Sequence, residues 1–545
     1  MYKVLDLFSG AGGMSHGFVQ AGKFQIAVAV EKHPHAKATY RRNHKDTILL
    51  EDILDITDYD VFQRKYGEFD VIVGGPPCQG FSNANRQKNH IISQNNSLVK
   101  KYVEVIENLK PLAFVMENVR MLRSDTHRFY LSKNDDFDQL EINLRKEILC
   151  LHDGTCPIED IEKYILKPNI VEELLLPEKT FNVLKMVVKN SYKEEKRNEV
   201  LGKKAQNSIK VIDSIPQRNE QISNLYRQYE ENSLSFFLEY LKGTISFEEA
   251  EPHMVSYINL QRLLSAAKEL LDNEIIIEEL RIDETGIYAE VESITVVDYI
   301  KKKLGKMYLI EDDILNAAWF GAPQLRERYI ALGIKRNVAK ANDVKPELPK
   351  PEYSQYEFRT VWDAIKDLEE VEPSFSNTEV GIELSNKQYI KTALTGELRK
   401  SSVLYNHIAT QTRETARQRF AALKPGQNFH DLDKGLIQNT YSKPERTQNS
   451  IYLRLDYKKT CGTVTNVRKS MWIHPTIDRA LSIREAARLQ TFPDSFIFEG
   501  TKDSQYQQVG NAVPPIMAKA IASKVAEILD SCDLTIDIKE VAKTF

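Results

Sequence analysis

Short apolar runs alternate with segments of helical spacing over residues 1–120, and this alternation restricts the fold more than any other feature of the chain. Four runs are apolar enough to be buried strands, at residues 4–8, 25–30, 70–74 and 112–116, and a further strand is expected to end near residues 51–52. Strands that alternate with helices pair in parallel and carry helices on both faces of the sheet. We therefore expect an α/β fold with a doubly wound, mostly parallel sheet.

The middle of the 545-residue chain breaks this rhythm. Residues 124–291 contain four glycines and five prolines and are rich in Glu, Lys, Leu and Ile, which predicts a mostly helical insertion. The sheet is expected to resume near Ser293, with a helix to Leu304 and strands near residues 307–311 and 329–333. The predicted organisation is a catalytic domain in three parts (1–123, 292–335 and 478–530), the insertion (124–291), a smaller domain (336–477) and a C-terminal tail (531–545).

Charge is distributed unevenly along the chain, although the net charge is only −4. Residues 124–300 contain 21 basic and 34 acidic side chains, a net of −13, so the rest of the chain carries +9. Residues 401–480 hold 13 basic and 6 acidic side chains, a net of +7. A polyanion would bind the basic segment rather than the acidic middle, although charged runs are also ordinary solvated surface.

The composition indicates a cytoplasmic protein without membrane contact. No signal peptide is recognisable, and no apolar run approaches the ~20 residues that a membrane span needs. The five cysteines are few and irregularly spaced, as in proteins of a reducing compartment. Cys150 and Cys156 flank His152, but their spacing does not fit a common zinc site, so we expect no metal.

A cysteine follows two prolines in the sequence GGPPCQGFS at residues 74–82. The prolines can extend neither a strand nor a regular helix, so Cys78 should lie on a stiff loop beyond the carboxyl end of a strand. The flanking glycines let a flat substrate approach the backbone. A thiol in such a loop suits a nucleophile, and the alternative is an inert buried cysteine.

A glycine-rich turn, FSGAGG at residues 8–13, joins the first strand to a helix and is typical of a nucleotide-type site. Its spacing differs from GxGxxG, which favours an adenosyl ligand without a pyrophosphate. Glu31 follows the second strand, where a carboxylate can bind ribose hydroxyls. Asp52 could accept a hydrogen bond from an adenine amino group, and Phe8 could pack on the ring. Taken alone, each of these residues could also be an ordinary side chain at a strand end that binds no ligand.

Ionisable groups gather at the ends of two further expected strands. Glu117 follows four apolar residues, and a semi-buried carboxyl group tends to keep its proton, so it can donate to a ring nitrogen. A structural salt bridge is the alternative. Gln324, Arg326 and Arg328 alternate along one expected strand, so they should share a face. Two guanidiniums on one face suit a phosphate or a ring carbonyl, and a solvated face is the alternative.

The chain resembles bacterial-type DNA (cytosine-5-)methyltransferases in segments that follow the order of that family. They are DLFSGAGG (6–13), the acid at 31, Asp52, GGPPCQGFS (74–82), ENV (117–119), QLRER (324–328), RALSIREAARLQTFPD (479–494) and GNAVPP (510–515). These segments span about residues 1–123 and 292–530. The resemblance implies a fold of the S-adenosylmethionine-dependent methyltransferase type, with a target-recognition domain at 336–477 and with residues 479–489 bracing the two domains.

The resemblance also implies a mechanism on double-stranded DNA. The target cytosine would be flipped out of the duplex, and the Cys78 thiolate would attack C6 to form a covalent adduct. Carbon 5 would take the methyl group of S-adenosyl-L-methionine. Glu117 would bind the N3 and N4 edge of the base, Arg328 would hold O2, and Arg326 would lie nearby.

Further residues receive roles by their match to the motifs of the family. Cofactor contacts are expected from Asp6, Phe8, Gly10, Gly12, Gly13, Glu31, Asp52, Ile53, Pro76, Asn511 and Val513. Contacts to the substrate or to DNA are expected from Gln79, Ser82, Asn118 and Gln324 and, in the recognition domain, from Arg413, Arg417, Arg419, Arg468 and Lys469. If residues 413–419 are helical, Arg413 and Arg417 share a face, and a solvated basic helix is the alternative.

The acidic insertion departs from the family pattern, and our hypothesis is that it docks a partner or shields the enzyme. The expected setting is a monomeric bacterial or phage enzyme in a restriction-modification or related defence system, with restriction or defence proteins as partners. A transfer-RNA cytosine methyltransferase is one rival, but the long recognition region favours DNA. A non-catalytic DNA-binding or cofactor-sensing protein is another, but Cys78, Glu117, Arg326 and Arg328 are all present.

Overall fold

The structure is a computed structural model, and it divides into two compact units. It describes residues 1–77, 94–135, 144–158, 160–216, 218, 222, 224–384, 390–437 and 444–534. The first unit comprises residues 1–82, 97–124 and 300–545, and the second comprises residues 83–96 and 125–299. Among the described residues, no helix is both long and apolar enough to cross a membrane.

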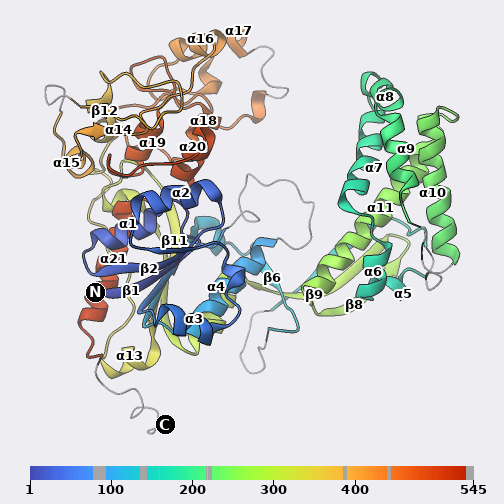
Figure 1. Ribbon diagram of the computed structural model, residues 1–545, viewed down its shortest axis with the longest axis horizontal. Coiled ribbons are helices and arrows are strands. Elements are labelled where there is room, and N and C mark those ends of the chain that lie inside the picture. Colours follow the sequence, from blue (N-terminus) through green and yellow to red (C-terminus); the bar gives the residue numbers. More distant parts are fainter. Residues whose placement is uncertain are drawn as a thin grey trace. The chain divides into compact units, whose positions relative to one another are not determined.

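A seven-stranded sheet forms the centre of the first unit, in the order β10-β11-β5-β4-β1-β2-β3 (Figure 1). Its strands are β1 Tyr2–Leu7, β2 Phe24–Val30, β3 Ile48–Leu50, β4 Val71–Gly74, β5 Ala113–Val119, β10 Tyr308–Asn316 and β11 Glu327–Lys335. The first five strands pair in parallel, whereas β11 runs antiparallel to both β5 and β10. The expected doubly wound, mostly parallel sheet is confirmed.

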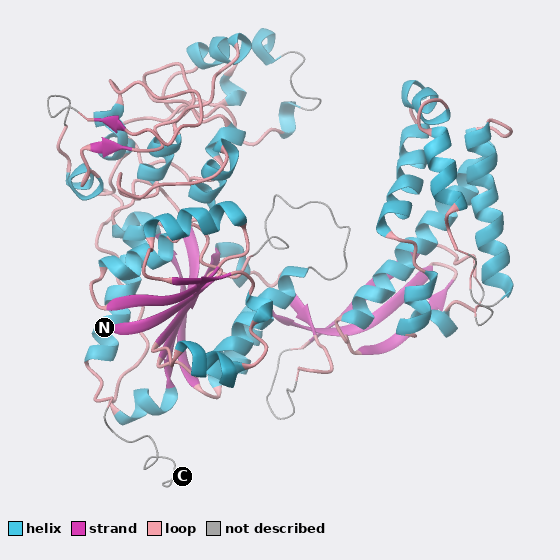
Figure 2. Cartoon of the chain, viewed as in Figure 1, coloured by secondary structure: helices cyan, strands magenta, loops and turns pink. Residues whose placement is uncertain are grey.

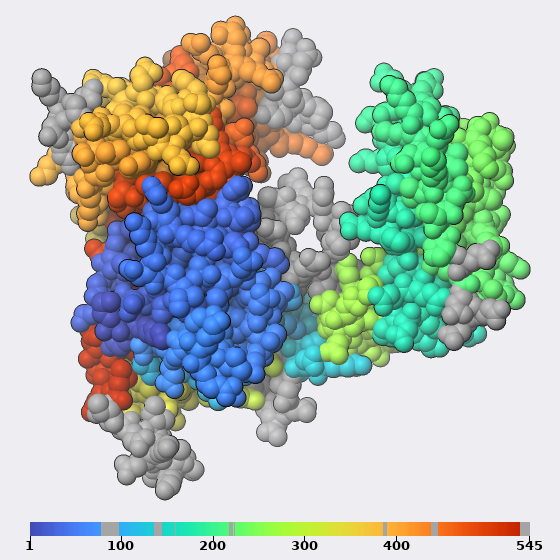
Figure 3. Space-filling view, in the orientation of Figure 1, coloured from blue at the N-terminus to red at the C-terminus, as the bar shows by residue number. Residues whose placement is uncertain are grey.

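Helices cover both faces of this sheet, and three short 3₁₀ helices follow strand ends (Figure 2). They are α1 Gly13–Gln20, α2 Pro34–Asn43, α3 Tyr59–Tyr66, α4 Gln94–Leu109, α13 Arg336–Ala341 and α21 Pro515–Asp530, with η1 Ile53–Asp55, η2 Arg120–Arg123 and η3 Ala317–Phe320. Helix α1, near the start of the chain, packs against α21, from its C-terminal part (Figure 3). A Cβ on Gly17 of α1 would lie 2.5 Å from Ala518 Cβ of α21. The core beneath them includes Val4, Val73, Val115, Ile330 and Met517.

Residues 336–477 belong to the same compact unit as the sheet. Their elements are short: α14 Val361–Ile365, β12 Ile382–Glu383, α15 Ala393–Leu398, β13 Val403–Leu404, α16 Glu414–Ala422, α17 Lys434–Ile437 and α18 Val467–Ser470. They are followed by α19 Ile483–Leu489 and α20 Lys502–Asn511. Arg488 of α19 is fully buried and bonds both Asp494 and Asp367, which joins this region to the catalytic part. The division of the unit into catalytic and recognition domains stays a prediction.

The second unit is mostly helical, as expected, but it also contains an antiparallel sheet that the sequence did not predict. Its antiparallel strands are β6 Arg128–Tyr130, β7 Arg145–Asp153, β8 Ile277–Asp283 and β9 Gly286–Thr295. The helices are α5 Glu162–Ile165, α6 Pro168–Leu174, α7 Glu178–Ser191, α8 Glu194–Leu201, α9 Ala205–Asp213, α10 Asn224–Lys242 and α11 Phe247–Asp272. Ser293 lies in β9 of this smaller sheet, so the large sheet resumes only at β10, after α12 Val296–Gly305.

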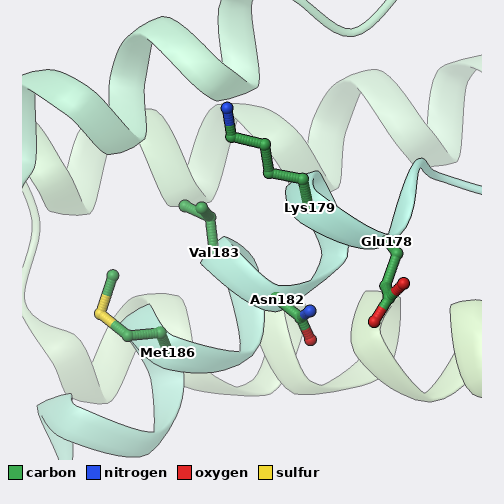
Figure 4. Close-up of a pocket in the computed structure, with 5 residues that line it drawn as sticks. All are labelled: Glu178, Lys179, Asn182, Val183 and Met186. Atoms are coloured by element: carbon green, nitrogen blue, oxygen red, sulfur yellow. The ribbon is translucent and has the colours of Figure 1, made fainter. Parts of the chain in front are cut away.

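A surface hollow of about 530 Å³ lies on α7 in the second unit (Figure 4). Its lining side chains are Glu178, Lys179, Asn182, Val183 and Met186. All five belong to one helix, α7, and lie within about two successive turns of it. The hollow therefore follows the surface of a helix and does not bring together reactive groups from different elements.

Candidate active site

The order of the strands places the glycine-rich turn and the cysteine loop at one edge of the sheet. The chain runs outward from β1 through β2 to β3 and then returns to β4 on the other side of β1. Ligands of such sheets bind where this reversal occurs, at the carboxyl ends of the strands. The turn after β1 and the loop after β4 both begin there.

The turn between β1 and α1 needs left-handed backbone at three positions. Phe8, Gly10 and Gly12 have φ values of 59°, 56° and 94°. A side chain on Gly12 would also collide with His44, because its Cβ would lie 2.6 Å from His44 Nε2. Phe8 adopts this conformation without being a glycine, which is strain of the kind found at binding sites.

Glu31 ties the end of β2 to this turn. Its Oε2 accepts a hydrogen bond from the Gly10 N–H at 2.8 Å, and its Oε1 accepts one from the His33 N–H at 2.7 Å. The residue is half-buried, and each carboxylate oxygen can accept a further hydrogen bond. The residue predicted to bind ribose hydroxyls therefore lies beside the predicted adenosyl turn.

Asp6 lies below the turn rather than on its surface. It is 1% exposed, and its Oδ2 accepts a hydrogen bond from Ser15 Oγ at 2.5 Å. Ser15 Oγ also lies 2.6 Å from the Tyr40 hydroxyl. Burial raises the pKa of Asp6 to about 7, and the charge of Glu31 adds to the rise. Asp6 thus braces α1 against α2, a role the sequence did not predict.

Asp52 and Ile53 follow β3 at the same edge of the sheet. The Asp52 side chain accepts from Lys32 Nζ at 2.6 Å and from the Leu54 N–H at 3.1 Å. These hydrogen bonds lower the pKa of the carboxyl group, so it is an acceptor rather than a donor. Ile53 is buried beneath it.

The loop that leads to Cys78 is held by the end of β5. Asn118 is buried, and its Nδ2 donates to the Pro76 carbonyl at 3.0 Å. A Cβ on Gly75 would lie 2.8 Å from Glu117 Oε2, so glycine lets the loop pass close to this carboxyl group. Cys78, Gln79 and Ser82 lie outside the described residues.

Glu117 forms an ion pair with Arg328, whose Nε lies 2.8 Å from Glu117 Oε1. Both side chains are largely buried, with 12% and 13% of their surface exposed. Burial raises the pKa of Glu117, while the charges of Arg328 and Arg326 act in the opposite direction. The carboxyl group is therefore easier to protonate than an ordinary glutamate, as the sequence argument expects, but it also forms the salt bridge that was the alternative to that argument.

Arg326 and Gln324 point into the protein, so they do not form with Arg328 the predicted strand face that meets a phosphate or a ring carbonyl. β11 begins only at Glu327, so Gln324 and Arg326 precede the strand. Arg326 is fully buried and donates to the carbonyls of Val464 at 2.7 Å and Gly510 at 2.9 Å. Gln324 is also fully buried and donates to Leu489 O at 2.9 Å and to Gln490 Oε1 at 2.6 Å. A DNA contact by Gln324 is not compatible with this burial, because internal acceptors hold its amide.

The GNAVPP segment closes the candidate site from the C-terminal side. Gly13 lies against this segment, since its Cβ would be 2.5 Å from the Val513 carbonyl oxygen. Asn511 is exposed, and its Oδ1 accepts from Gln507 Nε2 at 2.7 Å. The structure thus brings the predicted cofactor residues near positions 10, 31 and 513 to one place.

The predicted DNA-contacting cations of the recognition region divide into two groups. Arg413, Arg417, Arg468 and Lys469 are exposed, and Arg468 also bonds Asp503 at 2.7 Å. Arg419 is buried and donates to Leu436 O at 2.8 Å and to the Tyr452 hydroxyl at 3.0 Å. The prediction of a phosphate contact is therefore wrong for Arg419, because it supports the fold of this region. Arg413 caps α16, so only Arg417 of the expected pair lies within the helix.

Sequence reasoning missed the residues that support the site from behind. Ser15 donates a hydrogen bond to Asp6, and Tyr40 is hydrogen-bonded to Ser15. His44 packs against Gly12. The segment 461–466 runs alongside residues 324–326, with Cys461 paired to Gln324 and Thr463 Oγ1 donating to Leu325 O at 2.8 Å. Polar residues within otherwise apolar helical faces, such as Ser15, were the one available signal.

A model of the family of C-5 cytosine-specific DNA methylases matches residues 2–154 and 292–527. The match covers most of the chain and leaves out residues 155–291 of the second unit. It includes every segment that forms the candidate site described above.

Curated relatives align over nearly the whole chain. Type II methyltransferase M.DdeI of Desulfomicrobium norvegicum is 24% identical over 98% of this chain and 91% of its own length. DNA (cytosine-5-)-methyltransferase M.ApeKI of Aeropyrum pernix is 26% identical over 97% of this chain and 99% of its own. Among solved structures, a prophage-encoded E. coli protein described as a DNA modification methyltransferase has the same fold, with a TM-score of 0.54, 19% identity and coverage of 97% of this chain and 100% of its own.

Proposed function

Because the chain belongs to the family of C-5 cytosine-specific DNA methylases and is thus a DNA (cytosine-5-)-methyltransferase, we propose a mechanism in which Cys78 attacks a flipped-out cytosine. The observation that carries the proposal is the Glu117–Arg328 pair, which lies against Gly75, three residues before Cys78. A pre-positioned acid beside a nucleophile loop is what addition to a pyrimidine ring requires.

In the proposed reaction, the Cys78 sulfur forms a bond to C6 of cytosine and electron density moves to C5. Glu117 in its protonated form donates to N3, which stabilises the charge that develops on the ring. Its raised pKa supports this role. After C5 has taken the methyl group of S-adenosylmethionine, which leaves as S-adenosylhomocysteine, water takes the C5 proton. The electron pair of the C5–H bond then forms the C5–C6 double bond as the C6–S bond breaks, which releases the Cys78 thiolate and restores the aromatic ring.

Arg328 has two tasks in this scheme. Its pairing at 2.8 Å fixes the carboxyl group of Glu117, and a further N–H of the guanidinium donates to the Glu327 carbonyl at 2.8 Å. We expect it to meet O2 of the base once the base is flipped into the site. Arg326 contributes charge from inside the protein, where its hydrogen bonds to Val464 and Gly510 join three segments of the site.

The residues of the turn fit an adenosyl cofactor. Left-handed backbone at Gly10 and Gly12 opens the turn, and the half-exposed carboxylate of Glu31 can accept from ribose hydroxyls. Asp52, Ile53, Phe8, Pro76, Asn511 and Val513 would complete the contacts. S-adenosylmethionine supplies the methyl group when it is bound there.

We further propose that the substrate is double-stranded DNA in the cytoplasm and that the exposed cations Arg413, Arg417, Arg468 and Lys469 contact its phosphates. The relatives named Type II methyltransferase support a restriction-modification setting. A restriction or defence-system protein is then the expected partner of a monomeric enzyme.

Methyl transfer from labelled S-adenosylmethionine to unmethylated genomic DNA tests this function. Wild-type protein should label cytosine carbon 5 in one short context found by bisulfite sequencing. C78S should be inactive, and E117Q should be at least about 100-fold slower while staying folded. Label on transfer RNA alone, or full activity of C78S, would contradict the proposal.

A further inference from the structure

We propose that Gln507 is a positioning residue that couples DNA bound at α18 to cofactor bound at Asn511. The proposal rests on the function proposed above, in which Arg468 and Lys469 meet DNA and Asn511 contacts S-adenosylmethionine. It adds a physical connection between these two contacts, through a side chain that belongs to neither.

The first half of the connection joins α18 to α20. Asn466 caps α18, since its Oδ1 accepts from the Lys469 N–H at 3.3 Å. The Nδ2 of the same side chain donates to Gln507 Oε1 at 3.1 Å. One turn earlier on α20, Asp503 accepts from Arg468 at 2.7 Å. Asp503 and Gln507 are four residues apart and therefore lie on the face of α20 that meets α18.

The second half runs along α20 to the cofactor side. Gln507 Nε2 donates to Asn511 Oδ1 at 2.7 Å, one turn further on. Each amide side chain has an acceptor and a donor, so fixing one member of the chain orients the next. A DNA phosphate that orders α18 would thus hold Asn466, then Gln507, and finally Asn511.

The backbone around this chain is bound together independently. Arg326 donates to both Val464 and Gly510, and a Cβ on Gly510 would lie 2.5 Å from the Thr465 carbonyl carbon. The residues before Asn466 and before Asn511 are therefore packed on each other. Against this backbone, the half-exposed side chain of Gln507 links Asn466 to Asn511 through both atoms of its amide.

The experiment measures binding of S-adenosylhomocysteine by calorimetry, with and without a duplex that contains the methylated site. We expect DNA to tighten binding about fivefold in the wild type, at the lower end for coupled sites. In Q507L, the ratio of S-adenosylhomocysteine affinity with DNA to that without DNA should fall to about one. At saturating DNA, the KM of this variant for S-adenosylmethionine should be about fivefold higher than that of the wild type, with little change in kcat. Q507A removes the same two hydrogen bonds without added bulk and should give the same result.

D503A is the matched control, because it removes the side-chain oxygen that accepts from Arg468 on the same face of α20 and leaves the amide chain intact. It should keep the fivefold ratio. The proposal would be overturned if DNA still tightened S-adenosylhomocysteine binding fivefold in both Gln507 variants. It would also be overturned if DNA did not change this binding in a wild-type protein that methylates DNA. Failure of the wild type to bind S-adenosylhomocysteine or to methylate DNA would instead overturn the proposed function.

Discussion

Asp6 is a carboxyl group almost without contact with water, and its ionisation is therefore coupled to folding. Burial disfavours the charged form and raises the pKa of Asp6 to about 7, from an ordinary value of 3.8. Between these two values the folded state binds a proton that the unfolded state has released. Asp6 thus favours the folded state below about pH 4, and this contribution is lost as the pH rises to about 7.

We expect Asp6→Asn to remove this pH dependence. Relative to the variant, the wild type should lose up to about 1.4 kcal/mol of unfolding free energy per pH unit between pH 4 and 7. Denaturant unfolding at several pH values measures the difference. Asp46→Asn is the control, because Asp46 is exposed. Parallel pH profiles for the wild type and Asp6→Asn would contradict the expectation.

At the scale of elements, β5 holds the loop that follows β4. Two prolines in this loop have no N–H to donate, so at these two positions the backbone can be held only through carbonyl groups. Asn118 uses the Pro76 carbonyl for this purpose at 3.0 Å, and Glu117 packs on Gly75 beside it. The position of the loop therefore depends on the end of a neighbouring strand.

Replacing Asn118 by alanine should slow methyl transfer without weakening cofactor binding. Loss of the buried hydrogen bond leaves the Pro76 carbonyl without its partner, which costs about 1–3 kcal/mol, and lets the loop shift. We expect kcat to fall about tenfold or more, because small shifts of reacting groups are expensive. Single-turnover rates and cofactor titration measure the two effects.

Asn108→Ala provides the comparison, because Asn108 makes a similar amide bond to Glu104 O at 2.8 Å on the exposed side of α4. It should keep the wild-type rate. If Asn118→Ala is equally active, the loop does not depend on β5.

At the scale of the whole molecule, the two units have separate hydrophobic cores. One core contains residues from Leu151 to Val291, all within the second unit, and includes Leu184, Phe237 and Leu263. The sheet of the first unit has its own core. The net charge of −13 over residues 124–300 disfavours DNA binding by the second unit.

Replacing residues 125–299 by a Gly/Ser linker should leave the first unit folded and able to bind cofactor. DNA affinity should change less than about threefold, because the deleted segment is acidic. Cofactor titration and a DNA mobility shift are the measurements. A folded deletion variant that has lost DNA affinity would refute the partner-docking hypothesis for the insertion.

The sequence alone was sufficient where the physical cause is local. Apolar runs and expected strand ends predicted the five strands that the structure describes before residue 120, and the glycine-rich sequence FSGAGG predicted the turn at residues 8–13. Glu117 was predicted to be easily protonated because four apolar residues precede it, and burial indeed raises its pKa. The family motifs identified the chemistry, since they consist of contiguous residues whose types can be read directly.

Only the tertiary structure decided which polar residues face inward. Three polar residues are of types common on DNA-binding surfaces: Gln324, Arg326 and Arg419. Each is nevertheless buried and donates hydrogen bonds to carbonyl groups more than 15 residues away in the sequence. The large sheet was predicted to resume near Ser293, but Ser293 pairs in the smaller sheet. The sequence pattern of a strand does not specify which strand it pairs with. The Asn466–Gln507–Asn511 chain spans residues that no local pattern connects. Burial and long-range pairing depend on the packing of distant segments, and the order of residues along the chain does not specify that packing locally.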